Sequence, residues 1–163
     1  MKGDRFLIAI VVGVVLLVVV VVVVVLLGAG EAAYRAGDTA EDVTYNYLLA
    51  LHKEEYARAY GYLSPDLPGY PETADDFRRD VRGNRWSFDL GEEVSLAVEG
   101  MDATGDSAVV MVRRTHFSGG GLFDSGQYSY TFDVTLGRHD GAWKIEGADR
   151  YWASCWDQSN GCR

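Results

Sequence analysis

The sequence is poor in the side chains that most often bind metals. Its 163 residues include two cysteines and three histidines. The C-x6-C spacing of Cys155 and Cys162 is not a zinc spacing, and His52, His116 and His139 form no ligand pattern. The sequence therefore predicts no metal site, and we expect no cofactor.

Basic residues are also scarce. Lys and Arg together number 15 and Asp and Glu number 24, so the formal net charge is -9. A nucleic-acid-binding protein needs a basic face to meet the phosphates. We therefore expect no nucleic-acid partner.

Charge is missing altogether from one long stretch. The run that begins at Phe6 and ends at Leu27 has no charged or polar side chain. As a helix it would be about 33 Å long, which matches a hydrocarbon core of about 30 Å, so it predicts a single transmembrane helix. Lys2 and Arg5 lie in the short head, residues 1–5, before this run. The positive-inside rule then predicts a cytoplasmic head and a domain outside a bacterial plasma membrane.

The alternative for residues 6–27 is a cleaved signal peptide. The small residues Gly28, Ala29 and Gly30 would suit a peptidase. The apolar part of a signal peptide is normally only about 7–15 residues long, and this run is longer. We therefore favour the uncleaved anchor.

The two cysteines raise the question of a disulfide. If the domain lies outside the cytoplasm, it occupies a compartment in which disulfides persist. Cys155 and Cys162 would then close a short loop in which Asn160 and Gly161 can turn. The prediction is one disulfide, and the alternative is two reduced, inert thiols.

After a linker at residues 28–37, helical spacing predicts three helices. The first begins near Asp38 or Thr39, either of which can cap it with Glu41 or Asp42 reaching back. The second covers residues 53–63, before a break that holds all three prolines (residues 65–71). The third covers residues 74–81 and is capped by Thr73.

A period of two replaces helical spacing after Gly83 and predicts four to five strands. The first is WSFDL, which would place Trp86, Phe88 and Leu90 on one face. VSLAV, SAVVMVRRTHF, QYSYTFDVTL and AWKIEGADRYW follow, joined by the turns TGDS and RHDG and by the longer connection SGGGLFDSG, which we expect to be a mobile tip. Helices followed by a strand meander predict an α+β fold with a strongly curved antiparallel sheet.

Three stretches resemble the nuclear transport factor 2-like superfamily, which shares a cone-shaped fold with ketosteroid isomerase and scytalone dehydratase. DVTYNYLLALHKEEYARAYGYLSPDL is similar to its opening helices and GDSAVVMV to its central strand. DGAWKIEG is similar to its closing strand, with Trp143 and Ile145 pointing inward. The resemblance implies a domain over residues 38–152, a pocket inside the curved sheet and a separate tail at residues 153–163.

Two strand pairings predict what lines this pocket. One pairs Phe117 with Gln127, and the other pairs Gly137 with Ala142. Both pairings place the same alternate residues of these strands on one face of the sheet. One end of that face is apolar, and the other end carries polar and aromatic side chains. The candidate ligand-binding residues at this second end are Arg114, His116, Tyr128, Tyr130, Asp149 and Tyr151.

Within that set, His116 and Asp149 are the candidates for catalysis, because a carboxylate can orient an imidazole for acid–base chemistry. The alternatives are a structural histidine and an Arg114–Asp149 pair that caps the sheet. The tyrosines fit core and rim positions as well as a binding site.

The opposite sheet face, which includes Val109, Met111 and Phe117, is half apolar. The family resemblance implies a partner surface there, for a homodimer or an envelope protein. The alternative is a solvated sheet with ordinary scattered apolar residues.

The sequence favours a membrane-tethered, non-enzymatic domain that binds a small ligand or a protein. One alternative is a small dehydratase, isomerase or hydrolase that uses the His–Asp pair. The other is a structural accessory subunit of an envelope complex.

Overall fold

The computed structural model describes residues 3–28, 32–89, 91, 94–119 and 125–162. The chain divides into two compact units, Met1–Ala33 and Tyr34–Arg163. The boundary falls inside the stretch predicted as a linker, since Tyr34 already belongs to the second unit. The connection at residues 120–124, predicted as a mobile tip, lies outside the described residues.

The first unit carries the helix α1 (Gly3–Gly28). Among the residues that the structure describes, no helix combines the length and the apolar character that crossing a membrane requires. This finding corrects the prediction of a transmembrane helix from Phe6 to Leu27, and with it the predicted membrane localisation.

The second unit begins with α2 (Ala40–His52), whose cap is Thr39, one of the two predicted candidates. The Thr39 hydroxyl accepts a hydrogen bond from the Asp42 backbone N–H at 3.2 Å and donates one to the Asp42 carboxylate at 2.8 Å. α4 (Ala74–Gly83) begins in the same way, with the Thr73 hydroxyl accepting from the Asp76 N–H at 3.1 Å. Both caps satisfy donors that the first helical turn leaves without partners.

α3 (Tyr56–Tyr60) is shorter than the predicted helix at residues 53–63. The reason lies at Glu54, whose φ of 55° is in the left-handed region and interrupts the helical backbone after α2. The side chain of Glu55, at the cap position of α3, makes no capping hydrogen bond. The chain therefore turns between α2 and α3.

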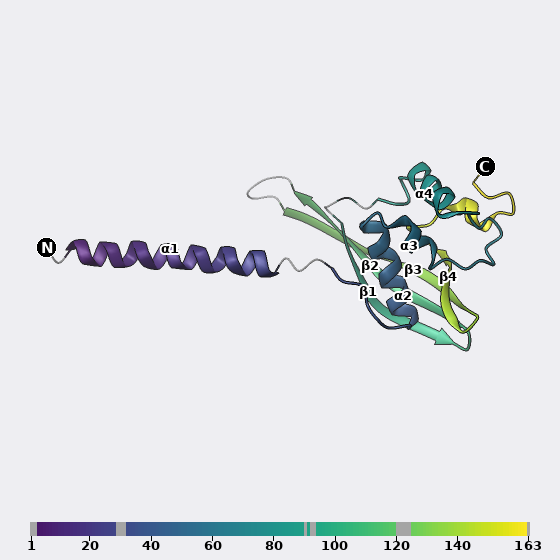
Figure 1. The fold of residues 1–163 in the computed structure, drawn as a ribbon, viewed down its shortest axis with the longest axis horizontal. Helices are drawn as coiled ribbons and strands as arrows, with labels where there is room; N and C mark the ends of the chain where they lie inside the picture. The colour runs from purple at the N-terminus through teal and green to yellow at the C-terminus, as the bar shows by residue number, and fades with distance from the viewer. Residues whose placement is uncertain (1–2, 29–31, 90, 92–93, 120–124, 163) are drawn as a thin grey trace. The chain divides into compact units, whose positions relative to one another are not determined.

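Among the described residues, four antiparallel strands form one sheet in the order β1-β2-β3-β4. They are β1 (Val94–Thr104), β2 (Ser107–Gly119), β3 (Ser125–His139) and β4 (Ala142–Ala148). The α+β fold is confirmed, and Figure 1 shows the helices of this unit following one another along the chain before the sheet. The predicted fifth strand is wrong: residues 84–87 form a turn, Phe88 and Asp89 are irregular, and Leu90 lies outside the described residues.

The pairing of β2 with β3 has the predicted register, with Phe117 opposite Gln127. The predicted pairing of β3 with β4 is wrong, because His139, rather than Gly137, lies opposite Ala142. The strands are joined by a tight turn through Asp140 and Gly141, whose φ values of 50° and 82° suit a two-residue hairpin. Farther from the turn, the register shifts once, between Thr135 and Leu136.

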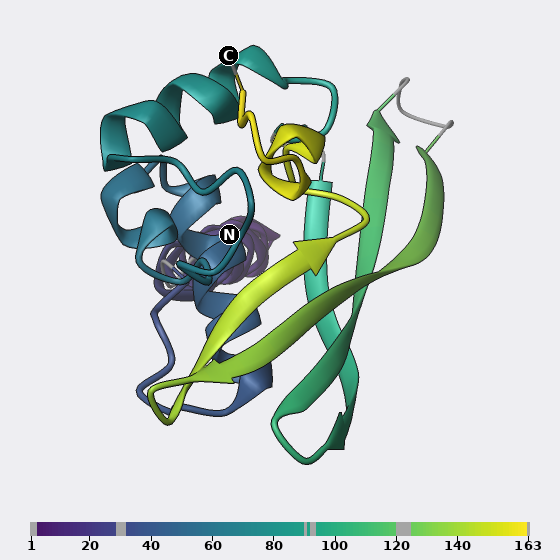
Figure 2. The same cartoon turned by 90° about the vertical axis from the view of Figure 1, so that its right-hand side faces the viewer.

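The helices of the second unit cover one face of the curved sheet, as Figure 2 shows. Alternate residues of β2 and β3 point into this layer, so their side chains are buried while their neighbours are exposed. The inward-facing apolar set is Val110, Val112, Phe132, Val134 and Leu136. The opposite face is open, and the role predicted for it as a partner surface stays a prediction.

The end of the chain completes this core. The short 3-10 helix η1 (Ser154–Asp157) carries Trp156, which is fully buried. Its ring stacks on Phe77 with centroids 5.2 Å apart and meets Trp152 edge-on at 4.9 Å. Its indole N–H donates to the Asp80 carboxylate at 3.0 Å, and burial raises the pKa of that carboxyl. Residues 153–163, predicted to be a tail, thus contribute a central core side chain.

The disulfide between Cys155 and Cys162 is confirmed, with Cα atoms 5.0 Å apart. It closes a loop around Trp156 that packs against Gly69, whose backbone N–H donates to the Trp156 carbonyl at 2.9 Å. A Cβ at Gly69 would lie 2.3 Å from the Cys155 carbonyl oxygen. Only glycine lets the loop approach so closely.

Trp156→Ala should lower the free energy of unfolding by about 3–5 kcal/mol, because a large buried ring leaves a cavity. Chemical denaturation measures this change. Trp86→Ala is the matched control, since Trp86 is 71% exposed and its removal should change stability by about 0.5 kcal/mol or less. Equal effects of the two substitutions would contradict the assignment of Trp156 to the core.

Replacing Cys155 and Cys162 together by Ser should lower the free energy of unfolding by up to about 2–3 kcal/mol, because the unfolded chain is no longer constrained. Reductant should destabilise the wild-type protein by the same amount. It should leave the double variant unchanged, which controls for other effects of the reagent. A wild-type protein indifferent to reductant would show that the bond contributes nothing to stability.

Candidate functional site

A cleft of about 380 Å³ opens at the end of the sheet where β2 and β3 meet the segment after α4. Its lining comes from four parts of the chain. The residues are Trp86, Ser87, Asp89, Arg114, Tyr128, Tyr130, Arg150 and Tyr151. Four of the six predicted site residues lie in this set, namely Arg114, Tyr128, Tyr130 and Tyr151.

Arg114 forms the base of the cleft. It follows Val110 and Val112 on the inward face of β2, so the strand carries its side chain into the core, where 6% of it is exposed. Its Nε donates to the Tyr151 hydroxyl at 3.1 Å, and its Nη2 is paired with the Asp89 carboxylate. Burial opposes the charge, but the hydrogen bond to Tyr151 favours it and the pKa of Arg114 is raised. The guanidinium therefore stays positively charged.

Tyr151 is held from several sides. Its backbone N–H donates to the Ser87 carbonyl at 3.1 Å, and its carbonyl accepts from the Tyr47 hydroxyl at 2.6 Å. Its own hydroxyl donates to the Asp89 carbonyl at 3.0 Å. Burial raises its pKa, although the Arg114 guanidinium opposes this shift. The side chain is thus a neutral phenol that both accepts and donates at the base of the cleft.

Aromatic rings form one wall. The rings of Tyr128 and Tyr130 are nearly parallel with centroids 6.4 Å apart, and the His116 ring stacks on Tyr128 with centroids 5.3 Å apart. The guanidinium carbons of Arg114 and Arg150 lie 5.7 Å and 5.8 Å from the Tyr130 ring centre. Two positive charges therefore flank one electron-rich ring.

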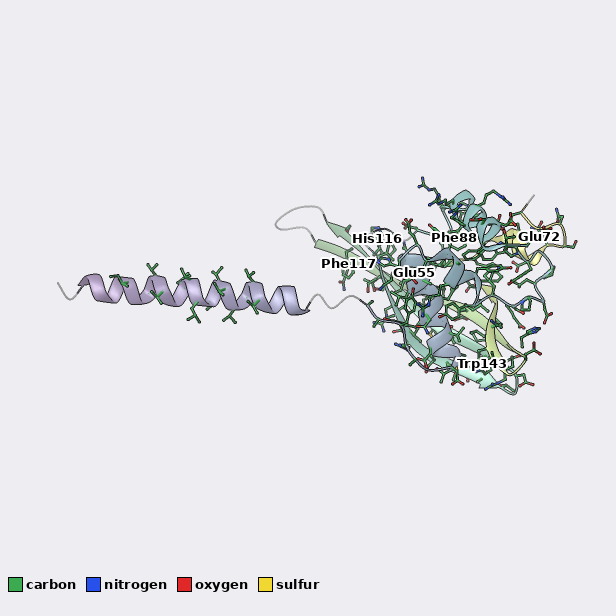
Figure 3. All side chains as sticks on the ribbon, in the orientation of Figure 1. Glu55, Glu72, Phe88, His116, Phe117 and Trp143 are labelled. Carbon is green, nitrogen blue, oxygen red and sulfur yellow. A yellow bond between two sulfur atoms is a disulfide. The ribbon has the colours of Figure 1, made fainter. Side chains whose placement is uncertain are left out.

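The structure does not bring His116 and Asp149 together. His116 lies opposite Tyr128, whereas the Asp149 backbone N–H donates to the Asp133 carbonyl at 3.1 Å and its carboxylate accepts from the Asp133 N–H at 3.2 Å. Tyr128 and Asp133 are five positions apart on β3, a distance of about 16 Å. Figure 3 shows His116 near one end of the β2–β3 hairpin.

The register shift in β4 explains this separation. Leu136 faces Ile145, but Thr135 faces Gly147, so Glu146 is the extra residue of a β-bulge. Beyond the bulge the side chains of β4 exchange faces relative to β3. Asp149 therefore pairs with Asp133 on the outer side of the sheet instead of entering the cleft.

Among the residues that the structure describes, no group of three or more His, Cys, Asp or Glu side chains is arranged to hold a metal ion. The chemistry that the cleft offers is recognition by hydrogen bonds, charge and aromatic surface. Its groups are two guanidiniums, one carboxylate, phenol hydroxyls and an indole.

Sequence reasoning missed Trp86, Ser87, Asp89 and Arg150. The first three were assigned to a strand, although they belong to an irregular segment. One signal could have revealed Asp89. Arg114 alternates with core valines, and a buried guanidinium requires a carboxylate or several hydrogen-bond acceptors close by.

No known protein family matches the sequence. No curated protein matches it either. Similar solved structures include a SEC-C motif containing protein from Rhodopseudomonas palustris, with 17% identity, a TM-score of 0.46, and coverage of 72% of this chain and 83% of that one.

Two further similar structures come from other bacteria. A candidate association domain of calcium/calmodulin-dependent protein kinase type II from Thiobacillus denitrificans has 12% identity and a TM-score of 0.47, with 72% of this chain and 99% of that chain covered. A candidate dehydratase of the NTF2-like family from Streptomyces avermitilis has 14% identity and a TM-score of 0.42, with 65% and 88% covered. At these values no activity is carried over from them.

Tyr151→Phe should lower the free energy of unfolding by about 1–3 kcal/mol, because it removes an acceptor from buried Arg114 and a donor from the Asp89 carbonyl. Thermal or chemical denaturation measures the change. Tyr45→Phe is the control, since its hydroxyl makes no hydrogen bond to the described residues while its ring contact with Arg35 is kept. If both variants behave alike, the Tyr151 hydroxyl does not organise the site.

Proposed function

We propose that the unit Tyr34–Arg163 binds a small organic ligand in the cleft at Arg114. The observation that carries this proposal is a charged guanidinium at the base of an open cleft with aromatic walls. Ligand sites commonly combine apolar and aromatic surface with a few fixed polar groups, in volumes of about 300–1,000 Å³. The cleft of about 380 Å³ lies within that range.

We also infer a nuclear transport factor 2-like architecture for this unit. The stretches that carry the resemblance fold as α2 with α3, as β2 and as β4, and the helices cover the inward face of the sheet. The cleft opens at one end of this sheet, which is where a cone-shaped fold would place a pocket mouth. These observations support the inference from the arrangement of elements alone.

We propose binding rather than a reaction because the cleft lacks an acid–base pair from the predicted candidates. Asp149 is engaged by the backbone of Asp133, and His116 is stacked on Tyr128. The carboxylate that does line the cleft, Asp89, is paired with Arg114. The Asp89 carboxylate is therefore already engaged in an ion pair.

The test is a screen of the full-length protein against a library of small acids, amides and amines, followed by ligand-detected NMR. Native mass spectrometry of the freshly purified protein gives a second readout, a retained small molecule. Tyr128→Ala should weaken binding of the hits by between about twofold and tenfold, because one stacking face is lost.

Phe117→Ala is the matched control for Tyr128→Ala. Phe117 is also an exposed aromatic residue near the same end of the β2–β3 hairpin, but it lies on the opposite face of the sheet. Its removal should leave binding unchanged. A library without hits, or equal losses in the two variants, would overturn the proposal.

A further inference from the structure

We propose that the cleft takes a planar aromatic carboxylate, and that the Asp89 carboxylate is an internal competitor which the ligand displaces from Arg114. This inference rests on the proposed function and adds the ligand class and a specificity-determining residue. It is carried by the charges of the lining, by the unequal burial of the Arg114–Asp89 pair and by the stacked tyrosines.

The charges of the lining select an anion. The lining contains two guanidiniums, Arg114 and Arg150, and one carboxylate, Asp89. The cleft is therefore locally positive in a chain whose net charge is -9. Among the described residues, Arg150 makes no ion pair, and its guanidinium lies over the Tyr130 ring. A cationic ligand does not fit this cleft, even though it has aromatic walls. The two guanidiniums in the lining would repel it.

The two side chains of the Arg114–Asp89 pair differ in burial. The guanidinium is 6% exposed and is fixed by β2 and by Tyr151, whereas the Asp89 side chain is 57% exposed and belongs to a segment without helix or strand. Because the carboxylate is already largely in water, moving it away from Arg114 requires little repacking. Moving the guanidinium would leave a buried position in the core unfilled.

The backbone of Asp89 is held independently of its side chain. The Tyr151 hydroxyl donates to the Asp89 carbonyl at 3.0 Å, and this bond does not involve the carboxylate. A side-chain rotation of Asp89 is therefore enough to free the Nη2 donor of Arg114. A ligand carboxylate would then restore a charge-assisted pair, so that no buried charge is left without a partner.

The rest of the cleft fits a flat ring attached to that carboxylate. Tyr128 and Tyr130 present nearly parallel rings beside Arg114, and exposed Trp86 lies in the same lining. Such surfaces favour offset stacking with a planar partner. The group that already occupies Arg114 is a carboxylate, so the guanidinium is oriented for this anion.

The test compares 2-naphthoate with its neutral counterpart 2-naphthamide, using calorimetry on the full-length protein. The wild-type protein should bind the acid more tightly than the amide by about tenfold or more, since only the acid makes charge-assisted hydrogen bonds. Asp89→Asn should tighten binding of the acid by about tenfold and leave the amide unchanged.

Asp106→Asn is the control for a change in net charge. Asp106 is also an exposed aspartate near a guanidinium, that of Arg138, but it lies outside the cleft. Its substitution removes the same charge and should change the affinity for 2-naphthoate by less than about twofold. A gain equal to that of Asp89→Asn would show that general electrostatics, and not displacement at Arg114, causes the effect.

A measurement on the wild-type protein covers the case in which Asp89→Asn does not fold. The ¹³C resonance of the Asp89 carboxyl group should move to the position of a solvated carboxylate when 2-naphthoate saturates the protein. A resonance that stays in place overturns the competitor role. Likewise, an Asp89→Asn variant that folds but binds the acid no more tightly overturns it.

The outcomes separate this inference from the proposed function. If 2-naphthamide binds as well as 2-naphthoate, the ligand class is wrong and the binding function stands. If neither compound binds but other library members bind with the loss expected for Tyr128→Ala, the inference fails alone. If no compound in the library binds, both fail.

Discussion

The second unit depends on the hydrogen bonds of one residue near the end of the chain, Tyr151. Its carbonyl accepts from Tyr47 on α2, and its N–H donates to Ser87 in the segment after α4. Its hydroxyl joins Arg114 on β2 to the backbone of Asp89. Because Tyr151 itself has a φ of 57°, a region that non-glycine residues rarely adopt, the surrounding bonds must hold it there. The same hydrogen bonds of Tyr151 therefore form the base of the cleft and hold the elements of the core together.

The sequence predicted those features that depend on neighbouring residues or on a simple period. Thr39 and Thr73 cap the helices because their hydroxyls need only the N–H three residues later. The β2–β3 register followed from alternation, since a slip by one residue would have turned the core valines outward. Arg114, Tyr128 and Tyr130 were consequently placed on the correct face.

The remaining features depend on long-range contacts that local patterns do not encode. A two-residue turn and the bulge at Glu146 moved Asp149 away from the cleft, and in AWKIEGADRYW the one local signal of a bulge is Gly147 beside it. WSFDL alternates like a strand, yet the segment folds irregularly so that Phe88 packs on Trp156 and Asp89 reaches Arg114. Trp156 itself lies beyond the stretch that resembles a known fold, and only burial against α4 shows its role.

The position of Arg114 explains why structure and recognition need not conflict in this unit. A buried guanidinium requires a counter-charge at all times, since leaving it unpaired would destabilise the fold. A carboxylate on a rigid strand would make that pairing permanent. Here the counter-charge belongs to a largely exposed side chain, while a separate hydrogen bond from Tyr151 holds its backbone. The requirement for a negative charge at Arg114 can then be met by Asp89 or by a ligand, without any change in the strands that form the core.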